Sequence, residues 1–80
     1  MTFEEAKRKA RYGHKPYITY TRRDGTEVVD RMTPATIKQA LLAVGTQGKF
    51  YMIAASSGVL HRYGWWVGLN LIRNWRHLHG

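Results

Sequence analysis

The step Asp24-Gly25 stands between two runs rich in β-branched and aromatic residues, at 17–22 and 26–31. An Asp-Gly step flanked in this way is the strongest short-range indication of a β-hairpin, because Gly adopts the positive φ that tight turns require. A two-residue turn predicts a register with three cross-strand pairs: Arg22–Glu27, Tyr20–Val29 and Ile18–Arg31. Val29 would then share a face with Ile18 and Tyr20, and the pattern leaves open which face is buried.

Two helices are indicated by capping residues and by apolar positions at helical spacing. The first begins at Thr2, which forms a capping box with Glu5, and is expected to run to Tyr12 with Gly13 as its C-cap. Its predicted ion pairs, four residues apart, are Glu4–Arg8 and Glu5–Lys9. The second helix begins at Thr33-Pro34, an N-cap followed by proline at the first helical position. Its core stripe, which ends before Gly45, consists of Ile37, Ala40, Leu41 and Val44.

The rest of the chain predicts two further strands and a final helix. The strands are expected at 49–54 and 59–63, joined by the turn Ser56-Ser57-Gly58. A helix from Trp65 to Leu78 would collect its apolar residues on one side: Trp65, Val67, Leu69, Leu71, Ile72, Trp75 and Leu78. We therefore expect residues 1–80 to form a single small α+β domain with one helix layer on one sheet layer. Its elements are an N-terminal helix, a β-hairpin, a short helix, a second strand pair and a C-terminal basic amphipathic helix.

Length and composition limit the class of protein. Eighty residues suffice for one domain with a small core, and 44% apolar and 12% aromatic residues are too many for a disordered chain. The chain has no cysteine, which excludes disulfides and thiolate metal sites. No apolar run approaches the ~20 residues that span a bilayer, and no apolar signal segment opens the chain. These features predict a soluble, intracellular, cytoplasmic protein.

The charge is strongly positive and unevenly distributed. The formal net charge is +8, and all five carboxylates lie within residues 1–30. From Arg31 to Gly80 there are six lysines and arginines, three histidines and no acid. Such an asymmetry favours a polyanionic partner, whether an acidic protein surface, nucleic acid or anionic lipid, although a merely solvated charged surface is the alternative.

Residue patterns for catalysis are not recognisable. No nucleophile stands beside a base, no cofactor loop occurs, and Gly45–Lys49 is a turn rather than a phosphate loop because it precedes a strand. His77 and His79 are two residues apart, whereas a helical metal site needs four. His61, Arg62 and Tyr63 could serve a metal-free ribonuclease, but a lone strand histidine is more often a surface residue. We therefore expect the protein to have no catalytic activity and to bind neither a cofactor nor a metal ion.

Basic residues interleaved with aromatic ones are the remaining signal. Lysine and arginine contact phosphates or acidic groups, and exposed aromatic rings stack on bases or fill pockets of a protein. The strongest candidates for partner binding lie in the acid-free part of the chain: Arg62, Trp66, Arg73, Arg76 and His77. A second group lies nearer the N-terminus: Lys7, Arg8, Arg22 and Arg23. For Lys7 and Arg8 the helix dipole offers a structural alternative.

In length, absence of cysteine, α+β make-up and lack of a catalytic pattern, the chain resembles small phage-encoded accessory proteins that block host machinery, anti-CRISPR proteins among them. This resemblance is one of size and composition, and it assigns no residue a role. It implies a non-catalytic inhibitor that acts by covering a partner's surface, with nucleic-acid-handling complexes as one expected target. Many such inhibitors are acidic, whereas this chain carries a net charge of +8, so we expect an inhibitor or adapter that docks a basic face on an acidic surface of a protein complex. The alternatives are a nucleic-acid-binding module and, behind it, a small ribonuclease.

Overall fold

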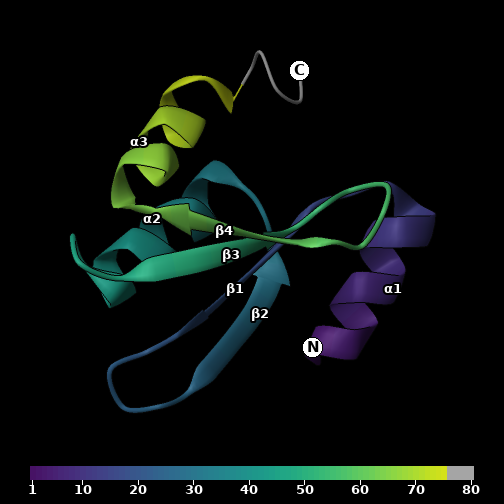
Figure 1. Ribbon diagram of the computed structural model, residues 1–80, viewed down its shortest axis with the longest axis horizontal. Helices are drawn as coiled ribbons and strands as arrows, with labels where there is room; N and C mark the ends of the chain where they lie inside the picture. The colour runs from purple at the N-terminus through teal and green to yellow at the C-terminus, as the bar shows by residue number, and fades with distance from the viewer. Residues whose placement is uncertain (76–80) are drawn as a thin grey trace.

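The computed structural model describes residues 1–75 of the chain. The described part contains three helices and a four-stranded antiparallel sheet, so the predicted α+β class is confirmed (Figure 1). Its elements, in chain order, are α1 (Phe3–Gly13), β1 (Tyr17–Thr21), β2 (Glu27–Arg31), α2 (Pro34–Val44), β3 (Lys49–Ile53), β4 (Leu60–Gly64) and α3 (Trp65–Arg73). The predicted continuation of the last helix to Leu78 lies outside the described residues. No helix in residues 1–75 has the length and apolar character to cross a membrane.

The strands are ordered β2-β1-β3-β4, so β1 and β3 are the inner strands. The first hairpin turns at Asp24-Gly25 as predicted, but its predicted register is wrong by one residue. Tyr20 pairs with Val28 and Ile18 pairs with Asp30. Val28, rather than Val29, therefore shares a face with Ile18 and Tyr20.

The cause of the register shift is the length of the turn, which holds three residues instead of two. The Arg22 N–H donates to the Thr26 carbonyl at 2.8 Å, and the Gly25 N–H donates to the Arg22 carbonyl at 3.0 Å. Gly25 takes φ of 89°, the left-handed conformation that closes a type I turn with a bulge. The Asp24 side chain also accepts from the Thr26 N–H at 2.9 Å, which fixes the residue that follows the three-residue turn.

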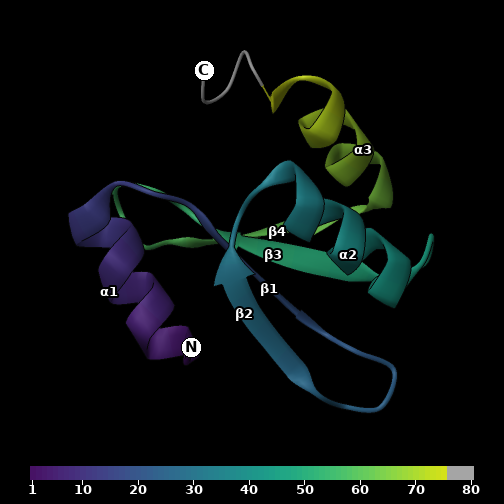
Figure 2. The same cartoon turned by 180° about the vertical axis from the view of Figure 1, so that it is seen from behind.

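Both faces of the sheet are covered by helices, so the expected arrangement of one helix layer on one sheet layer is wrong. The inner strand β1 buries adjacent residues, Tyr17 and Ile18, which point to opposite faces. Tyr17 packs in a cluster with Ala6 and Ala10 of α1, whereas Ile18 belongs to the main core beneath α2. Figures 1 and 2 show α1 well apart from α2 and α3. The domain therefore has three layers.

The predicted helix N-caps are confirmed, and one predicted C-cap is wrong. The Thr2 hydroxyl accepts from the Glu5 N–H at 3.2 Å, and Thr33, directly before Pro34, forms a reciprocal capping box with Thr36. The return bond of the predicted Thr2–Glu5 capping box, from the Thr2 N–H to the Glu5 side chain, is not formed within residues 1–75. At the end of α1 the left-handed residue is His14, with φ of 53°, because the helix continues through Gly13.

Gly68 determines how α3 sits on the core. It is the one fully described α3 residue that is buried, and a Cβ at this position would lie 2.8 Å from the Leu41 Cδ2 atom. The small residue lets the α3 backbone approach α2 and β3 closely. The predicted apolar arc is therefore centred wrongly, because Val67, expected in the core, is exposed. Trp65 and Trp75 are partly buried against the core, as predicted.

Candidate partner-binding groove

An apolar groove runs between α2 and α3. Its volume is about 510 Å³, and it is lined by Lys38, Leu41, Leu42, Trp65, Leu69, Ile72 and Arg73. The walls come from two helices that Gly68 brings close together, so the groove is a product of helix packing and not of one sequence motif. We call it the α2–α3 groove.

Leu42 forms the outer edge of the groove on α2. It follows Leu41, which is 7% exposed, yet Leu42 itself is 83% exposed. A step of one residue turns a helical side chain by about 100°, so Leu42 leaves the core stripe and points into solvent. Scattered exposed leucines are ordinary, but one that adjoins an apolar groove extends a patch of the kind found at protein interfaces.

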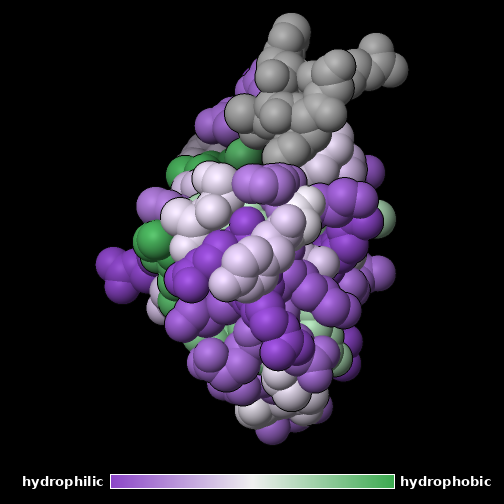
Figure 3. All heavy atoms as spheres, turned by 90° about the vertical axis from the view of Figure 1, so that its right-hand side faces the viewer, coloured by the Kyte–Doolittle hydropathy of each residue, from purple (hydrophilic) through white to green (hydrophobic). Residues whose placement is uncertain are grey.

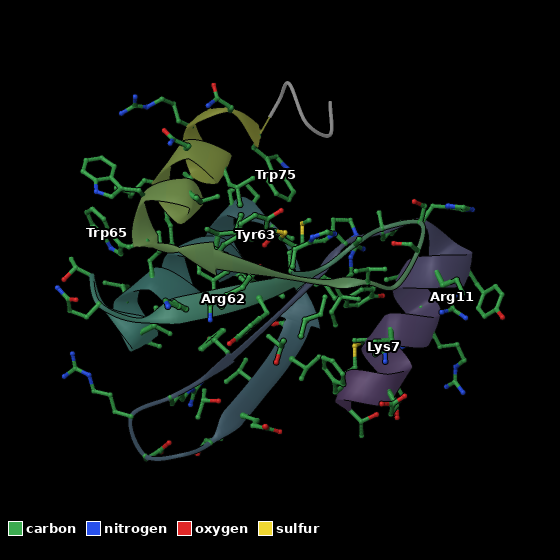
Figure 4. The ribbon with its side chains drawn as sticks, viewed as in Figure 1. Lys7, Arg11, Arg62, Tyr63, Trp65 and Trp75 are labelled. Carbon is green, nitrogen blue, oxygen red and sulfur yellow. The ribbon has the colours of Figure 1, made fainter. Side chains whose placement is uncertain are left out.

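Two tryptophans stand at the start of α3. Trp65 lines the groove and packs partly against the core. Trp66 is 72% exposed, and its ring meets that of Trp65 edge to face, with centroids 5.5 Å apart. β4 ends at Gly64, which is also the N-cap of α3, and the helix begins at the next residue. Both rings therefore lie in the first turn of α3. Figure 4 shows Trp65 at this end of α3, with Trp75 at the other end.

Positive charges border the groove. Among the lining residues the charged ones are Lys38 on α2 and Arg73 on α3, and both are exposed. A shallow hollow beside it shares Leu42 and is lined by Arg22, Arg23, Asp24, Leu42 and Ala43. Arg23 reaches the C-terminal end of α2, where its Nη2 atom lies 3.8 Å from the position that a Cβ would take on Gly45.

Asp24 lies near Arg22, but none of these cations forms a direct ion pair within residues 1–75. The same holds for every lysine and arginine in residues 1–75. The predicted ion pairs of α1, Glu4–Arg8 and Glu5–Lys9, are therefore not formed in this part of the chain. Asp24 is held in its turn, and the pKa of its carboxyl is lowered. The largest cause is the hydrogen bond from the Thr26 backbone, followed by one from the Thr26 side chain, and the charge of Arg22 also lowers this pKa. The positive side chains around the groove therefore remain available to an acidic group from outside.

The structure brings some of the sequence-predicted residues together and separates others. Arg73 lines the groove, and Arg22 and Arg23 line its adjoining hollow. Trp66 lies next to the groove, in contact with Trp65. Arg62 does not join them: it pairs with Tyr51 on β3, which faces the side of the sheet where α1 lies. Lys7 and Arg8 lie on α1 itself. Arg76 and His77 lie outside the described residues.

Sequence reasoning missed Lys38 and Leu42. The signal that could have found them is the position of Leu42, an apolar residue next to the core stripe of α2 and not part of it. Once Leu42 is placed on the surface, Lys38, one helical turn earlier, falls on the same side.

The residues considered for nuclease chemistry do not converge. His61 and Arg62 are neighbours on β4, so their side chains point to opposite faces of the sheet. The Tyr63 ring packs on Phe50 at 5.9 Å between centroids, and its hydroxyl lies 4.0 Å from the Met52 sulfur as a donor. In residues 1–75 no three histidine or carboxylate side chains are grouped so that they could hold a metal ion.

Comparison with known proteins identified no relative of this chain. No protein-family model matches the chain, and neither a curated protein nor a solved structure matches it.

Proposed function

We propose that this protein is a non-catalytic binding protein whose α2–α3 groove holds an apolar segment of a partner protein, flanked by acidic residues. The observation that carries the proposal is the composition of the groove. Leucine, isoleucine and tryptophan line it, and its charged residues are the cations Lys38 and Arg73. An apolar centre with a charged rim is the usual anatomy of a protein interface.

The apolar part supplies the affinity. Burial of apolar surface is favourable by roughly 25 cal/mol per Å², and tryptophan is among the residues that dominate binding energy. Trp66 and Leu42 leave most of their surface in water in the unbound protein. A partner that covers them gains this burial without having to open the core.

The charges select the partner. Lys38, Arg73 and the two arginines of the hairpin tip favour a segment that carries aspartate or glutamate, and they steer its approach. They also disfavour a second copy of this chain. Self-association through the groove would bring Lys38 and Arg73 of two copies together, and residues 31–80 contain no carboxylate to neutralise them.

Such a protein would act by occupying its partner's surface, as an inhibitor or adapter. This is the mode of action implied by its likeness in size and composition to small phage-encoded inhibitors. We place the encounter in the cytoplasm, because a chain without cysteine needs no oxidising compartment.

A pull-down from nuclease-treated lysate tests the proposal. The wild-type protein is compared with Lys38→Glu/Arg73→Glu and with Lys49→Glu/Arg62→Glu, a matched control that makes the same charge change at exposed positions away from the groove. We expect a protein retained by the wild type and the control to be lost from the groove variant. Proteins retained equally by all three, or lost entirely on nuclease treatment, would refute the proposal.

A further inference from the structure

The outer face of α1 carries a second concentration of positive charge. Five cations lie on this helix or just after it: Lys7, Arg8, Lys9, Arg11 and Lys15. Figure 3 looks onto the side of the molecule where α1 lies and shows mostly hydrophilic side chains there. This face is on the opposite side of the sheet from the α2–α3 groove.

Tyr12 lies in the middle of these charges and is 73% exposed. Two shallow grooves meet at it, and both include Arg8, one helical turn before Tyr12. The other cations of the first groove are Lys7 and Arg11, and those of the second are Lys9 and Lys15. Glu4 also lines the first groove, at its edge nearer the N-terminus. A chain that crosses α1 beyond Glu4 would meet cations, an open aromatic face and cations again.

Helix stability does not explain this arrangement. Cations favour the last turn of a helix because of its dipole, and this effect decays within that turn. In α1 only Arg11 occupies the last turn, so Lys7 and Arg8 gain little from it. Neither Glu4 nor Glu5 forms an ion pair within residues 1–75 that would account for the remaining cations.

Two of the cations lie beside other parts of the fold. The Lys7 Nζ atom lies 5.3 Å from the centroid of the Phe3 ring. Gly58, in the turn between β3 and β4, packs against the same flank of α1, where a Cβ on Gly58 would be 3.8 Å from the Arg11 Nε atom. Figure 4 shows Lys7 and Arg11 on α1, far from Trp65 and α3. The contact with Phe3 restricts the Lys7 side chain before binding, which lowers the entropy cost of binding a ligand there.

We propose that this face of α1 binds single-stranded nucleic acid, with phosphates on its lysines and arginines and one base stacked on Tyr12. Cationic tracks combined with an exposed aromatic ring are the features by which proteins hold single strands. A single strand fits better than a duplex, because its unpaired bases are free to stack on a ring. An anionic membrane fits worse, because the apolar side of α1 is already buried through Ala6 and Ala10.

The two surfaces can be occupied at once, because the sheet separates them. The protein would then hold a nucleic acid strand on one side and an acidic protein segment on the other. This inference does not depend on the groove, and each surface can be removed by substitutions that leave the other intact.

Fluorescence anisotropy with a labelled 12-residue oligothymidine tests the inference. Binding of single strands weakens with salt by a log–log slope of about −0.7 per phosphate contacted. Arg8→Gln/Arg11→Gln should flatten this slope by about 1.4 and lower the affinity at least tenfold at about 0.1 M salt. The same charge change on the opposite face, Lys38→Gln/Arg73→Gln, should alter the affinity less than threefold.

Tyr12 supplies the second readout. Tyr12→Ala should lower the affinity at least fivefold with the slope unchanged, because stacking is worth about 1–3 kcal/mol per base and involves no counterion. Tyr12→Phe should bind like the wild type. Three results would overturn the inference. They are an equal loss of affinity in Arg8→Gln/Arg11→Gln and Lys38→Gln/Arg73→Gln, full binding by Tyr12→Ala, and binding to anionic phosphatidylserine vesicles alone. Circular dichroism confirms folding of each variant.

Discussion

Gly68 of α3 lies so close to Phe50 of β3 that a Cβ at position 68 would stand 2.8 Å from the Phe50 Cε1 atom. This contact fixes the depth at which α3 sits on the core. The α2–α3 groove depends on it, because Leu41, which contacts the same point, and Leu69 beside it both line the groove.

Gly68→Ala should therefore destabilise the protein, although alanine favours a helix over glycine by about 1 kcal/mol. Overpacking a filled core costs typically 1–3 kcal/mol, and Phe50 is fully buried, so its ring has nowhere to move. We expect a net loss of about 1 kcal/mol, seen as a fall in Tm of about 4–8 °C. Gly13→Ala is the matched control, because no atom lies within 4 Å of its added Cβ. A Gly68→Ala protein as stable as the control would show that α3 is not held at this contact.

Substitution of the two adjacent tryptophans should affect stability differently. Trp66→Ala removes an exposed ring, so unfolding in urea should change by less than about 0.5 kcal/mol. Retention of the captured partner protein should nevertheless fall by about 30-fold or more, as for a central interface tryptophan at ~2 kcal/mol. Trp65→Ala removes a ring that packs against the core and should lower stability as well. Loss of stability in Trp66→Ala with unchanged retention would assign Trp66 to the core instead of the interface.

The hairpin turn should depend on pH through Asp24. Its pKa is lowered in the folded protein, so the carboxylate stabilises the fold above its ordinary pKa of 3.8, and this contribution is lost as the pH falls through the folded pKa. Asp24→Ala should lower Tm at neutral pH, and its difference from the wild type should shrink in acid. An NMR titration should place the Asp24 midpoint below 3.8.

Asp24→Asn separates charge from hydrogen bonding. Its amide oxygen can still accept from the Thr26 N–H, as the Asp24 Oδ1 does at 2.9 Å. This variant should keep most of the turn stability and lose the pH dependence. A gap between Asp24→Ala and the wild type that stays constant down to pH of about 2 would contradict the linkage.

The sequence predicted those features that depend on neighbouring residues. Thr33-Pro34 specifies the start of α2, and Asp24-Gly25 specifies the place of the hairpin turn, because each acts on backbone groups within a few residues. The hairpin register was missed for a similarly local reason. The hydrogen bond from the Thr26 N–H to Asp24 favours a three-residue turn, and residue composition does not distinguish this from a two-residue turn.

The groove could not be predicted in this way. Gly68 contributes to packing by lacking a side chain, so a hydrophobic projection of α3 gives it no weight and assigns Val67 to the core instead. Lys38 and Arg73 are distant in sequence and line one groove only because α3 packs on α2. Arg62 shows the reverse case, since a basic residue in the acid-free segment lies on the other side of the sheet from Arg73.

Photo-crosslinking from position 42 tests the central claim most directly. Leu42 is replaced by p-benzoylphenylalanine, and the protein is irradiated in nuclease-treated lysate of the cells in which it acts. Thr21 on β1, exposed and outside the α2–α3 groove, is the control position. Mass spectrometry should find one protein crosslinked at position 42 and not at position 21, through a peptide that combines apolar residues with aspartate or glutamate. Adduct formation that is equal at the two positions, or confined to position 21, would contradict the account.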